Sequence, residues 1–275
     1  MKTFDDETLI LENFRTIKDR EINFFGGLFN CLKIKFLTKS KFVSKTWVDS
    51  SSKSGLPPDF HNNRFRIMME VMRVDDCVNV IDGKHVVNSF ERANTFMKKY
   101  AGKDYKKALN GDLIFIPDTR NSEEFNFNGY INNFERVIIK HSNKVEEYRK
   151  NYPKCKTTVF FVCDESNNYI QVFNKNDLER EDEPDVYLEK FSPHKCYLDS
   201  KFIEIIKKCK ADYLIWFFRF KSIFIDGKEV FHPKACIYDI KNLKINGLIY
   251  NHNLMFKVKE EIDAKDLIGG KNEFF

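Results

Sequence analysis

The chain has 275 residues and a formal net charge of +5, so it is mildly basic and long enough for one large domain. Its hydrophobic content of 42% and aromatic content of 15% exclude an intrinsically disordered protein. The charge is below that of a protein that coats nucleic acid, although a local basic groove is compatible with it. The 28 Phe residues come with abundant Lys, Asn and Ile, as an AT-rich coding sequence would give, so this excess does not point to a function.

Short patterns exclude several other classes of protein. The seven cysteines are scattered and form no C-x-x-C pair, so they are interpreted as reduced core residues rather than zinc ligands. No glycine-rich nucleotide-binding loop and no H-x-x-x-H spacing occurs. The acidic N-terminus has no hydrophobic signal region, and no stretch of eighteen apolar residues exists. These patterns predict a cytoplasmic protein without a membrane partner.

The predicted elements begin with a helical spacing of apolar residues over about 6–36. Residues 42–47 are predicted to form a short strand. A β-hairpin is expected over 57–74, where "PPDF" and "FRIMMEVMRV" are joined by the turn-forming "HNNR". A capping-box-like start predicts a helix over 88–102, and an apolar run predicts a strand over 111–117.

The second half of the chain predicts more helices and strands in alternation. The strongest amphipathic pattern lies over 132–152 and predicts a helix that ends at Pro153. The continuously apolar run over 156–165 indicates a buried central strand. Further elements are expected in the C-terminal third: a helix over 199–210, strands over 213–220 and 234–240, and a hairpin over 245–258. This order predicts an α/β fold in which a mixed central sheet is flanked by helices in a single domain of residues 1–275.

Two carboxylates in the predicted hairpin are candidate metal ligands. Side chains alternate along a strand, so Glu70 shares a face with Met68 and Met72. A turn centred on residues 63–64 would place Asp59 opposite Met68 and diagonal to Glu70 on that face. This spacing permits a shared Mg²⁺ or Mn²⁺, which prefer oxygen ligands and could activate water at a phosphodiester.

The stretch "LPPDF…IMMEVMR", followed by a helix and "TTVFFVCDE", resembles the restriction-endonuclease-like superfamily with its Pro-Asp…(Asp/Glu)-x-Lys motif. The resemblance covers about 40–165 and implies a nuclease-like core, with a C-terminal αβ extension over about 185–275 on the same sheet. It implies a Mg²⁺-dependent endonuclease that hydrolyses DNA, in which Asp59 and Glu70 match the metal-binding acids. The family's lysine position is occupied here by Met72.

Other residues would have to supply the missing groups. Some members of the superfamily carry the basic residue on a neighbouring helix, for which Lys140 and Lys144 are the candidates here. Glu7 or Glu12 in the first helix would supply a third acid. His141 lies on the apolar face of the helix over 132–152 and is interpreted as a core histidine.

The lysine-rich segment over 33–47 is a candidate contact for nucleic acid. Lys39, Lys41 and Lys45 could contact phosphates, Trp47 could stack on a base, and Arg73 would add to the basic surface. A solvated edge strand protected by lysines would show the same pattern. The expected partner is DNA, with RNA as a second candidate and a homodimer as a candidate assembly.

Two alternatives to a nuclease remain open at the level of sequence. Asp59 could cap a turn while Glu70 forms a structural ion pair. The chain could also be a non-catalytic nucleic-acid-binding or protein-interaction protein that keeps a degenerate nuclease fold. An apolar wall around Met68 and Met72 would favour this second alternative, and a basic residue beside Glu70 would favour the enzyme.

Overall fold

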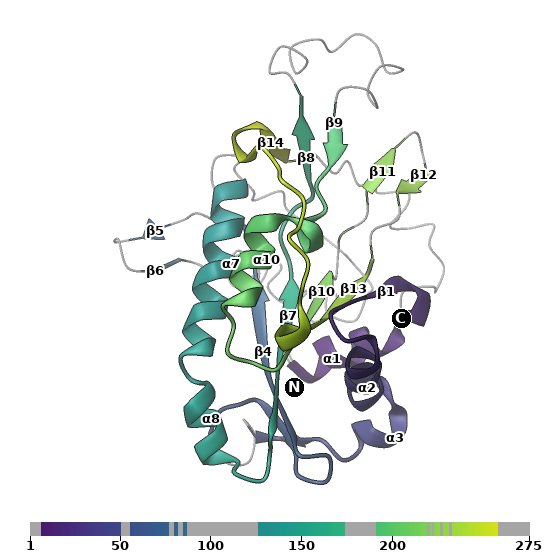
Figure 1. Ribbon diagram of the computed structural model, residues 1–275, viewed down its shortest axis with the longest axis vertical. Helices are drawn as coiled ribbons and strands as arrows, with labels where there is room; N and C mark the ends of the chain where they lie inside the picture. Colours follow the sequence, from purple (N-terminus) through teal and green to yellow (C-terminus); the bar gives the residue numbers. More distant parts are fainter. Residues whose placement is uncertain are drawn as a thin grey trace, which may run out of the picture.

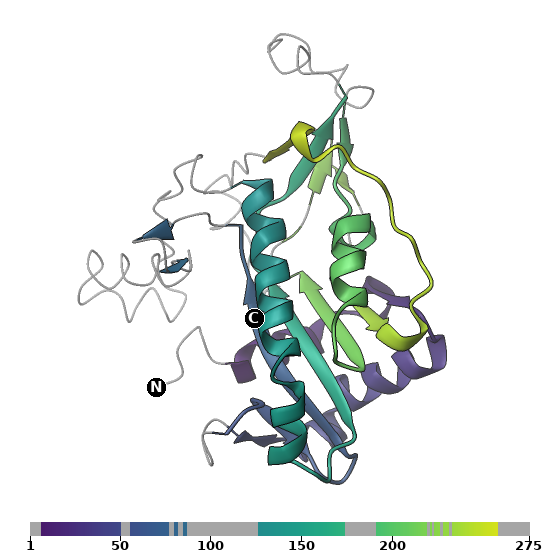
Figure 2. The same ribbon diagram turned by 60° about the vertical axis from the view of Figure 1, so that its left-hand side comes forward.

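Helices lie on both faces of a mixed seven-stranded sheet (Figures 1 and 2). The computed structural model describes residues 7–50, 56–76, 80–81, 85–86, 126–173, 191–218, 221, 223–225, 228–230 and 233–257. In spatial order the strands of this sheet are β1 (Ile22–Phe25), β13 (Ala235–Asp239), β10 (Tyr213–Phe218), β7 (Thr157–Asp164), β4 (Ile67–Val74), β3 (Phe60–Asn62) and β2 (Val48–Asp49). The predicted mixed α/β class is therefore confirmed.

The centre of the sheet is parallel and its flanks contain antiparallel pairs. Strands β4, β7 and β10 run parallel to one another, with Met69 beside Val159 and Val159 beside Tyr213. Strands β2, β3 and β4 form an antiparallel meander, and β13 is antiparallel to β10. The C-terminal third thus contributes β10 and β13 to the sheet that contains the predicted hairpin.

Strand β7 is continuously apolar from Val159 to Cys163 because both of its faces are covered. Phe160 and Val162 belong to one buried cluster, while Val159, Phe161 and Cys163 belong to the other. A strand that is buried on both sides has no solvent face, so its sequence shows no alternation of polar and apolar residues. The prediction of a buried central strand over 156–165 is confirmed.

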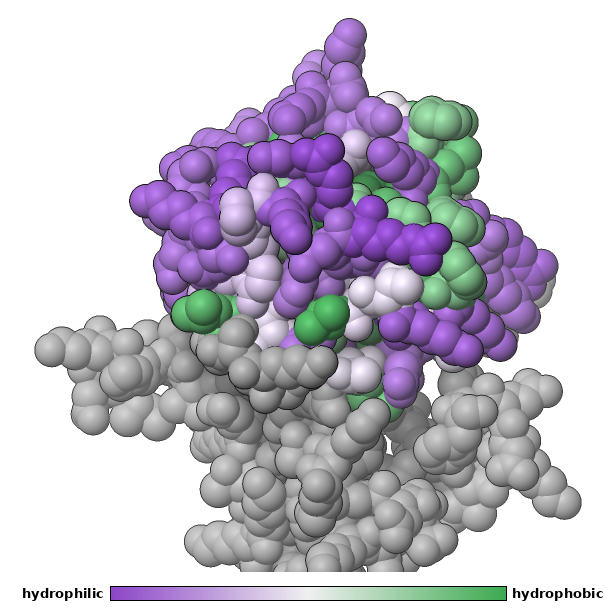
Figure 3. Space-filling model, turned by 90° about the horizontal axis from the view of Figure 1, so that it is seen from below, coloured by the Kyte–Doolittle hydropathy of each residue, from purple (hydrophilic) through white to green (hydrophobic). Residues whose placement is uncertain are grey.

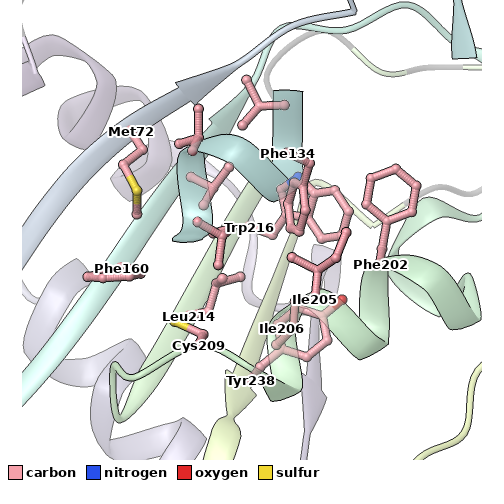
Figure 4. Close-up of a cluster of buried hydrophobic side chains, with 14 of the residues drawn as sticks. Met72, Phe134, Phe160, Phe202, Ile205, Ile206, Cys209, Leu214, Trp216 and Tyr238 are labelled. Atoms are coloured by element: carbon pink, nitrogen blue, oxygen red, sulfur yellow. The ribbon is translucent and has the colours of Figure 1, made fainter. Parts of the chain in front are cut away.

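The helices α7 (Phe127–Ser142), α8 (Val145–Asn151) and α10 (Ser200–Lys207) lie on one face of the sheet. The side chain of Asn126 accepts a hydrogen bond from Gly129 N, which fixes the start of α7. Phe134 of α7 and Phe202 of α10 pack on Trp216 of β10, with ring centroids 4.5 and 5.4 Å from it (Figure 4). The helix predicted over 132–152 is therefore two helices, with a break at residues 143–144.

The opposite face is covered by α1 (Glu7–Thr16), α2 (Leu28–Lys39) and the single turn α3 (Lys41–Ser44). Phe14 of α1 packs edge-on against Phe161 and Phe217 of the sheet. The helical spacing over 6–36 correctly indicated helices, but β1 separates α1 from α2. The strand predicted over 42–47 was wrong, because residues 41–44 form α3, a turn follows at 45–46, and the chain becomes extended only at β2.

Shorter elements surround the main sheet. They are the strands β8 (Tyr169–Val172), β9 (Phe191–Pro193), β14 (Met255–Lys257), β11 (Ile223–Ile225), β12 (Lys228–Val230), β5 (Val80–Ile81) and β6 (His85–Val86), and the 3-10 turns η1 (Asp19–Glu21), η6 (Cys196–Leu198), η7 (Ile240–Asn242) and η8 (His252–Leu254). Strand β14 pairs with β8, so the hairpin predicted over 245–258 was wrong. The elements predicted over 88–102 and 111–117 lie outside the described residues.

The described part of the chain contains no helix that is long and apolar enough to cross a lipid bilayer.

Candidate functional site

The predicted hairpin brings Asp59 and Glu70 together more closely than the sequence indicated. The pairs Phe60–Met69 and His61–Met68 fix the register of β3 against β4. Continued by one residue, this register places Asp59 directly opposite Glu70, not opposite Met68. The expected register was displaced by two residues because the turn occupies residues 63–66, where Arg66 has a φ of 56°.

The backbone around Asp59 is fixed at the point where β3 begins. Asp59 Oδ2 accepts a hydrogen bond from Val71 N at 2.8 Å. Val71 lies beyond the residues of β4 that pair with β3, so the carboxylate provides the hydrogen-bond acceptor for this backbone amide. The carbonyl of Asp59 accepts a hydrogen bond from Ser50 N at 2.7 Å. Asn151 Nδ2 of α8 donates to Pro57 O at 2.8 Å, which ties the segment before Asp59 to the helix layer. Asp59 is therefore positioned by three elements.

Electrostatics at Asp59 favour the neutral carboxyl. Burial and the neighbouring charge of Glu70 raise the pKa of Asp59 to about 8, against the hydrogen bond from Val71 N, which lowers it. The charges of Glu7 and Asp49 make smaller contributions to this rise in the pKa of Asp59. Of the two candidates for a third acid, Glu7 therefore lies close enough to act on the site, while Glu12 is exposed. A bound cation would relieve this repulsion.

Glu70 is buried, and its two oxygens have different surroundings. Glu70 Oε1 lies 2.8 Å from His141 Nδ1 of α7. The same nitrogen lies 3.1 Å from the hydroxyl of Tyr148, a group whose pKa is raised by burial, by the charge of Glu70 and by a hydrogen bond to Glu70. Glu70 Oε2 is buried and has no hydrogen-bond partner. An unpaired buried carboxylate oxygen is costly, so this atom is the strongest indication of a ligand at the site.

The basic residues expected on the neighbouring helix are not in the site. Lys140 and Lys144 are exposed and do not contact Glu70. His141 takes the place expected for a basic residue, although its position in an apolar stripe indicated a core histidine. The sequence did contain a signal for this contact. His141 is a titratable residue on the apolar face of its helix, and that face packs on the strand that carries Glu70.

Met72 lies in an apolar wall. It is 3% exposed and belongs to the same buried cluster as Met68, Phe160 and Phe134 (Figure 4). No water or phosphate group could be held by this position. Among the residues that the structure describes, no group of three or more His, Cys, Asp or Glu side chains has the arrangement of a complete metal site.

The predicted nucleic-acid contacts are only partly available. Lys39 donates to Ile17 O and Asp19, and Trp47 Nε1 donates to Leu37 O at 3.0 Å. Arg73 lies 3.7 Å from Glu165 Oε1. These three predicted contacts are thus engaged within the protein. Lys41 and Lys45 are exposed, as expected for residues that contact a partner.

A second polar cluster lies where β7 ends, and the sequence indicated only part of it. Asp164 is fully buried and accepts hydrogen bonds from Trp216 Nε1 at 2.9 Å and from the hydroxyl of Tyr130. Lys221 is also buried and lies 3.4 Å from Asp164 Oδ2. The hydrogen-bond donors around Asp164 and the ammonium group of Lys221 balance its charge, so the structure gives no reason to place a metal ion at this carboxylate.

Comparisons of the chain with models of protein families, with curated proteins and with solved structures find no match.

Proposed function

We propose that the protein is a metal-dependent nuclease that hydrolyses phosphodiester bonds of DNA. The observation that carries this proposal is the pairing of two largely buried carboxylates, Asp59 and Glu70, in which Glu70 Oε2 has no partner. The charge of Glu70 helps to raise the pKa of Asp59, and neighbouring carboxylates of this kind are a common basis for divalent-cation sites.

The residues present fit a hard cation with a small number of protein ligands. Asp59 and Glu70 Oε2 would hold Mg²⁺ or Mn²⁺, and waters and substrate oxygens would complete the coordination. A bound cation would supply charge stabilisation at phosphorus and a more acidic water. His141 contacts Glu70 Oε1, so it would orient the carboxylate and leave Oε2 as the oxygen available to the cation.

The order of elements around the pair supports the same proposal. Among the described elements, the meander β2–β3–β4 is followed by the short strands β5 and β6, then by α7 and α8, and then by β7, which is parallel to β4. The resemblance to the restriction-endonuclease-like superfamily implies a strand that carries Glu, then a helix, then a buried strand. Asp59 precedes β3 and Glu70 lies within β4, as that resemblance requires.

A second candidate function is favoured by the apolar wall at Met68 and Met72. These side chains are buried in the core and leave no basic group at the family's lysine position. A protein that keeps the fold only for binding nucleic acid or another protein would have this arrangement. His141 beside Glu70 is the feature that favours the enzyme over this alternative.

The test is cleavage of linear, supercoiled and single-stranded DNA in Mg²⁺ and in Mn²⁺. The wild-type protein is compared with Asp59→Asn and Glu70→Gln, which remove one ligand charge each and keep the side-chain shape. Glu146→Gln is the matched control, because Glu146 is an exposed carboxylate of α8. We expect cleavage by the wild type and by the control, and a loss of at least about 100-fold in each site variant.

Metal binding is measured separately from cleavage. Mn²⁺ should raise the melting temperature of the wild type and of Glu146→Gln, but not that of Glu70→Gln. DNA binding without cleavage or Mn²⁺ stabilisation would favour the non-catalytic alternative. Cleavage that persists in both site variants would show that the reaction takes place elsewhere in the chain.

A further inference from the structure

The outer face of α2 is apolar although it faces solvent. Its exposed residues are Leu28, Phe29, Leu32 and Phe36, and Phe42 of α3 continues the patch. Phe29 is 82% exposed and Phe42 is 64% exposed. At 100° per residue the four side chains of α2 cover roughly 100° of the helix surface. The opposite side of α2 is buried on the sheet, so the helix is apolar on two sides.

The location of these residues, not the Phe content of the chain, is the informative feature. Five of the nine large apolar side chains that are exposed among the described residues fall within the fifteen positions from Leu28 to Phe42. Scattered exposed apolar residues need no explanation, but a continuous patch indicates contact with a partner. Figure 3 shows hydrophobic side chains toward the right of this face of the molecule, with hydrophilic ones beside them, on the side where α2 lies in Figure 1.

The charged side chains of α2 and α3 are all basic, and the exposed acid next to them, Asp19 of η1, is paired with Lys35 and Lys39 of α2. The sequence contains no Asp or Glu from Ile22 to Val48. Lys33, Lys41 and Lys45 are exposed beside the patch. The guanidinium of Arg64, also exposed, lies 5.6 Å from the ring centroid of Phe42.

We propose that the apolar patch of α2 and α3 binds the surface of an anionic phospholipid bilayer. Phe and Leu side chains on an exposed helix enter the boundary between headgroups and acyl chains, and flanking lysines attract anionic lipids. The sequence alone predicted no membrane partner, because no segment could span a bilayer. Binding at the surface needs only one helix face and its basic neighbours.

The charges disfavour the other occupants of this patch. A second copy of the chain, placed symmetrically on the same patch, would bring the exposed Lys33, Lys41 and Lys45 of both copies into one interface, where like charges repel. Duplex DNA would gain from the lysines but would leave Leu28, Phe29 and Phe36 in water, since its phosphates offer them no apolar contact. An anionic lipid surface satisfies both kinds of side chain.

The test is co-sedimentation of the full chain with vesicles. One set contains phosphatidylcholine alone, and the other a mixture of phosphatidylserine and phosphatidylcholine. The variant Phe29→Ser/Phe36→Ser removes two exposed rings, and its control is Ile249→Ser, because Ile249 is 92% exposed but lies outside the patch. The variant Lys33→Glu/Lys41→Glu tests the charge, with Lys207→Glu on α10 as its control.

We expect the wild type and both controls to bind the anionic vesicles, with weaker binding at high salt. The lysine variant should lose about 25-fold or more in affinity, at about fivefold for each charge removed. The phenylalanine variant should lose about tenfold or more. Circular dichroism should show the same fold for all variants, because each substitution is at an exposed position.

Three results would overturn the proposal. The first is the absence of binding to anionic vesicles. The second is binding that is equally strong for the phenylalanine variant and for Ile249→Ser. The third is a wild-type dimer that the phenylalanine variant converts to a monomer without any vesicle binding, which would assign the patch to a second copy of the chain. None of these results depends on nuclease activity.

Discussion

The methionine at position 72 determines what the strand face beside Glu70 can do. Glu70 and Met72 point to the same side of β4, and Met72 is packed into the apolar cluster under α7. A lysine at this position would place an ammonium group among apolar side chains, at a distance of about two residues along the strand from the carboxylate. The packing of this face therefore opposes the residue that the family motif would place there.

We predict that Met72→Lys destabilises the protein by about 3 kcal/mol, because a buried charge without a well-placed partner is costly. The measurement is the midpoint of urea unfolding in the absence of divalent metal. Met72→Leu is the control and should lose less than about 1.5 kcal/mol, since it conserves volume and polarity. Equal stability of the lysine and leucine variants would contradict this prediction. It would mean that the ammonium group of the new lysine pairs with Glu70 and that the surroundings of residue 72 are not purely apolar.

The sequence identified the two carboxylates of the site but not the group that contacts them. Alternation along β4 is a property of any strand, so the face of Glu70 followed from the pattern alone. The register of β3 against β4 depended on the length of the turn, which the residues in "HNNR" did not determine. The contact of His141 with Glu70 depends on the packing of α7 on β4. Helical periodicity predicts which face of a helix is buried, but not which strand residue that face will contact.

At the scale of elements, the long periodic segments were predicted best. Strand β7 and helix α7 are long and bury many apolar residues, so their patterns agree with their structures. Strand β1 has only four residues and follows a helical pattern, so the sequence did not separate it. Its conformation is set by parallel pairing with β13, more than 200 positions later in the chain.

The connection from β1 to α2 requires glycine at position 26. Gly26 has a φ of 97°, and a Cβ atom there would lie 2.7 Å from Asp239 O at the end of β13. We predict that Gly26→Ala destabilises the protein by about 2 kcal/mol or more, through strain in the left-handed region and a contact with a fixed backbone atom. Thermal unfolding measures the effect.

Gly27→Ala is the neighbouring control for this prediction. Gly27 has a φ of −72°, which any residue adopts, and its Cβ would meet a side-chain oxygen of Asp239 rather than a backbone atom. A smaller loss is therefore expected than for Gly26→Ala. Equal losses for the two variants would mean that crowding at Asp239, and not the backbone conformation, limits this connection.

At the scale of the whole molecule, two separate sites give the stability an unusual dependence on pH. His194 lies 2.8 Å from the buried Asp199, and burial lowers the pKa of His194 to about 4. The unfolded chain therefore binds a proton at His194 between about pH 4 and 6.5, and the folded protein does not. Stability from this residue is lost as the pH falls through that range.

Asp59 has the opposite effect. Its folded pKa of about 8 lies above the unfolded value near 4, so the folded protein holds a proton that the unfolded chain has released. Stability from Asp59 is complete below about pH 4 and is lost as the pH rises toward 8. Between pH 4 and 6.5 the two residues oppose each other, and above pH 6.5 only the loss from Asp59 remains.

We therefore predict that the metal-free protein has nearly constant stability from pH 4 to 6.5 and becomes less stable from pH 6.5 to 8. A difference of one bound proton between the folded and the unfolded state changes the free energy of unfolding by about 1.4 kcal/mol per pH unit. In Asp59→Asn the loss above pH 6.5 should disappear and stability should fall on acidification. In His194→Gln stability should fall steadily from pH 4 to 8. Urea unfolding across this range measures all three profiles, and parallel profiles for the wild type and Asp59→Asn would show that the carboxylate pair does not hold a proton.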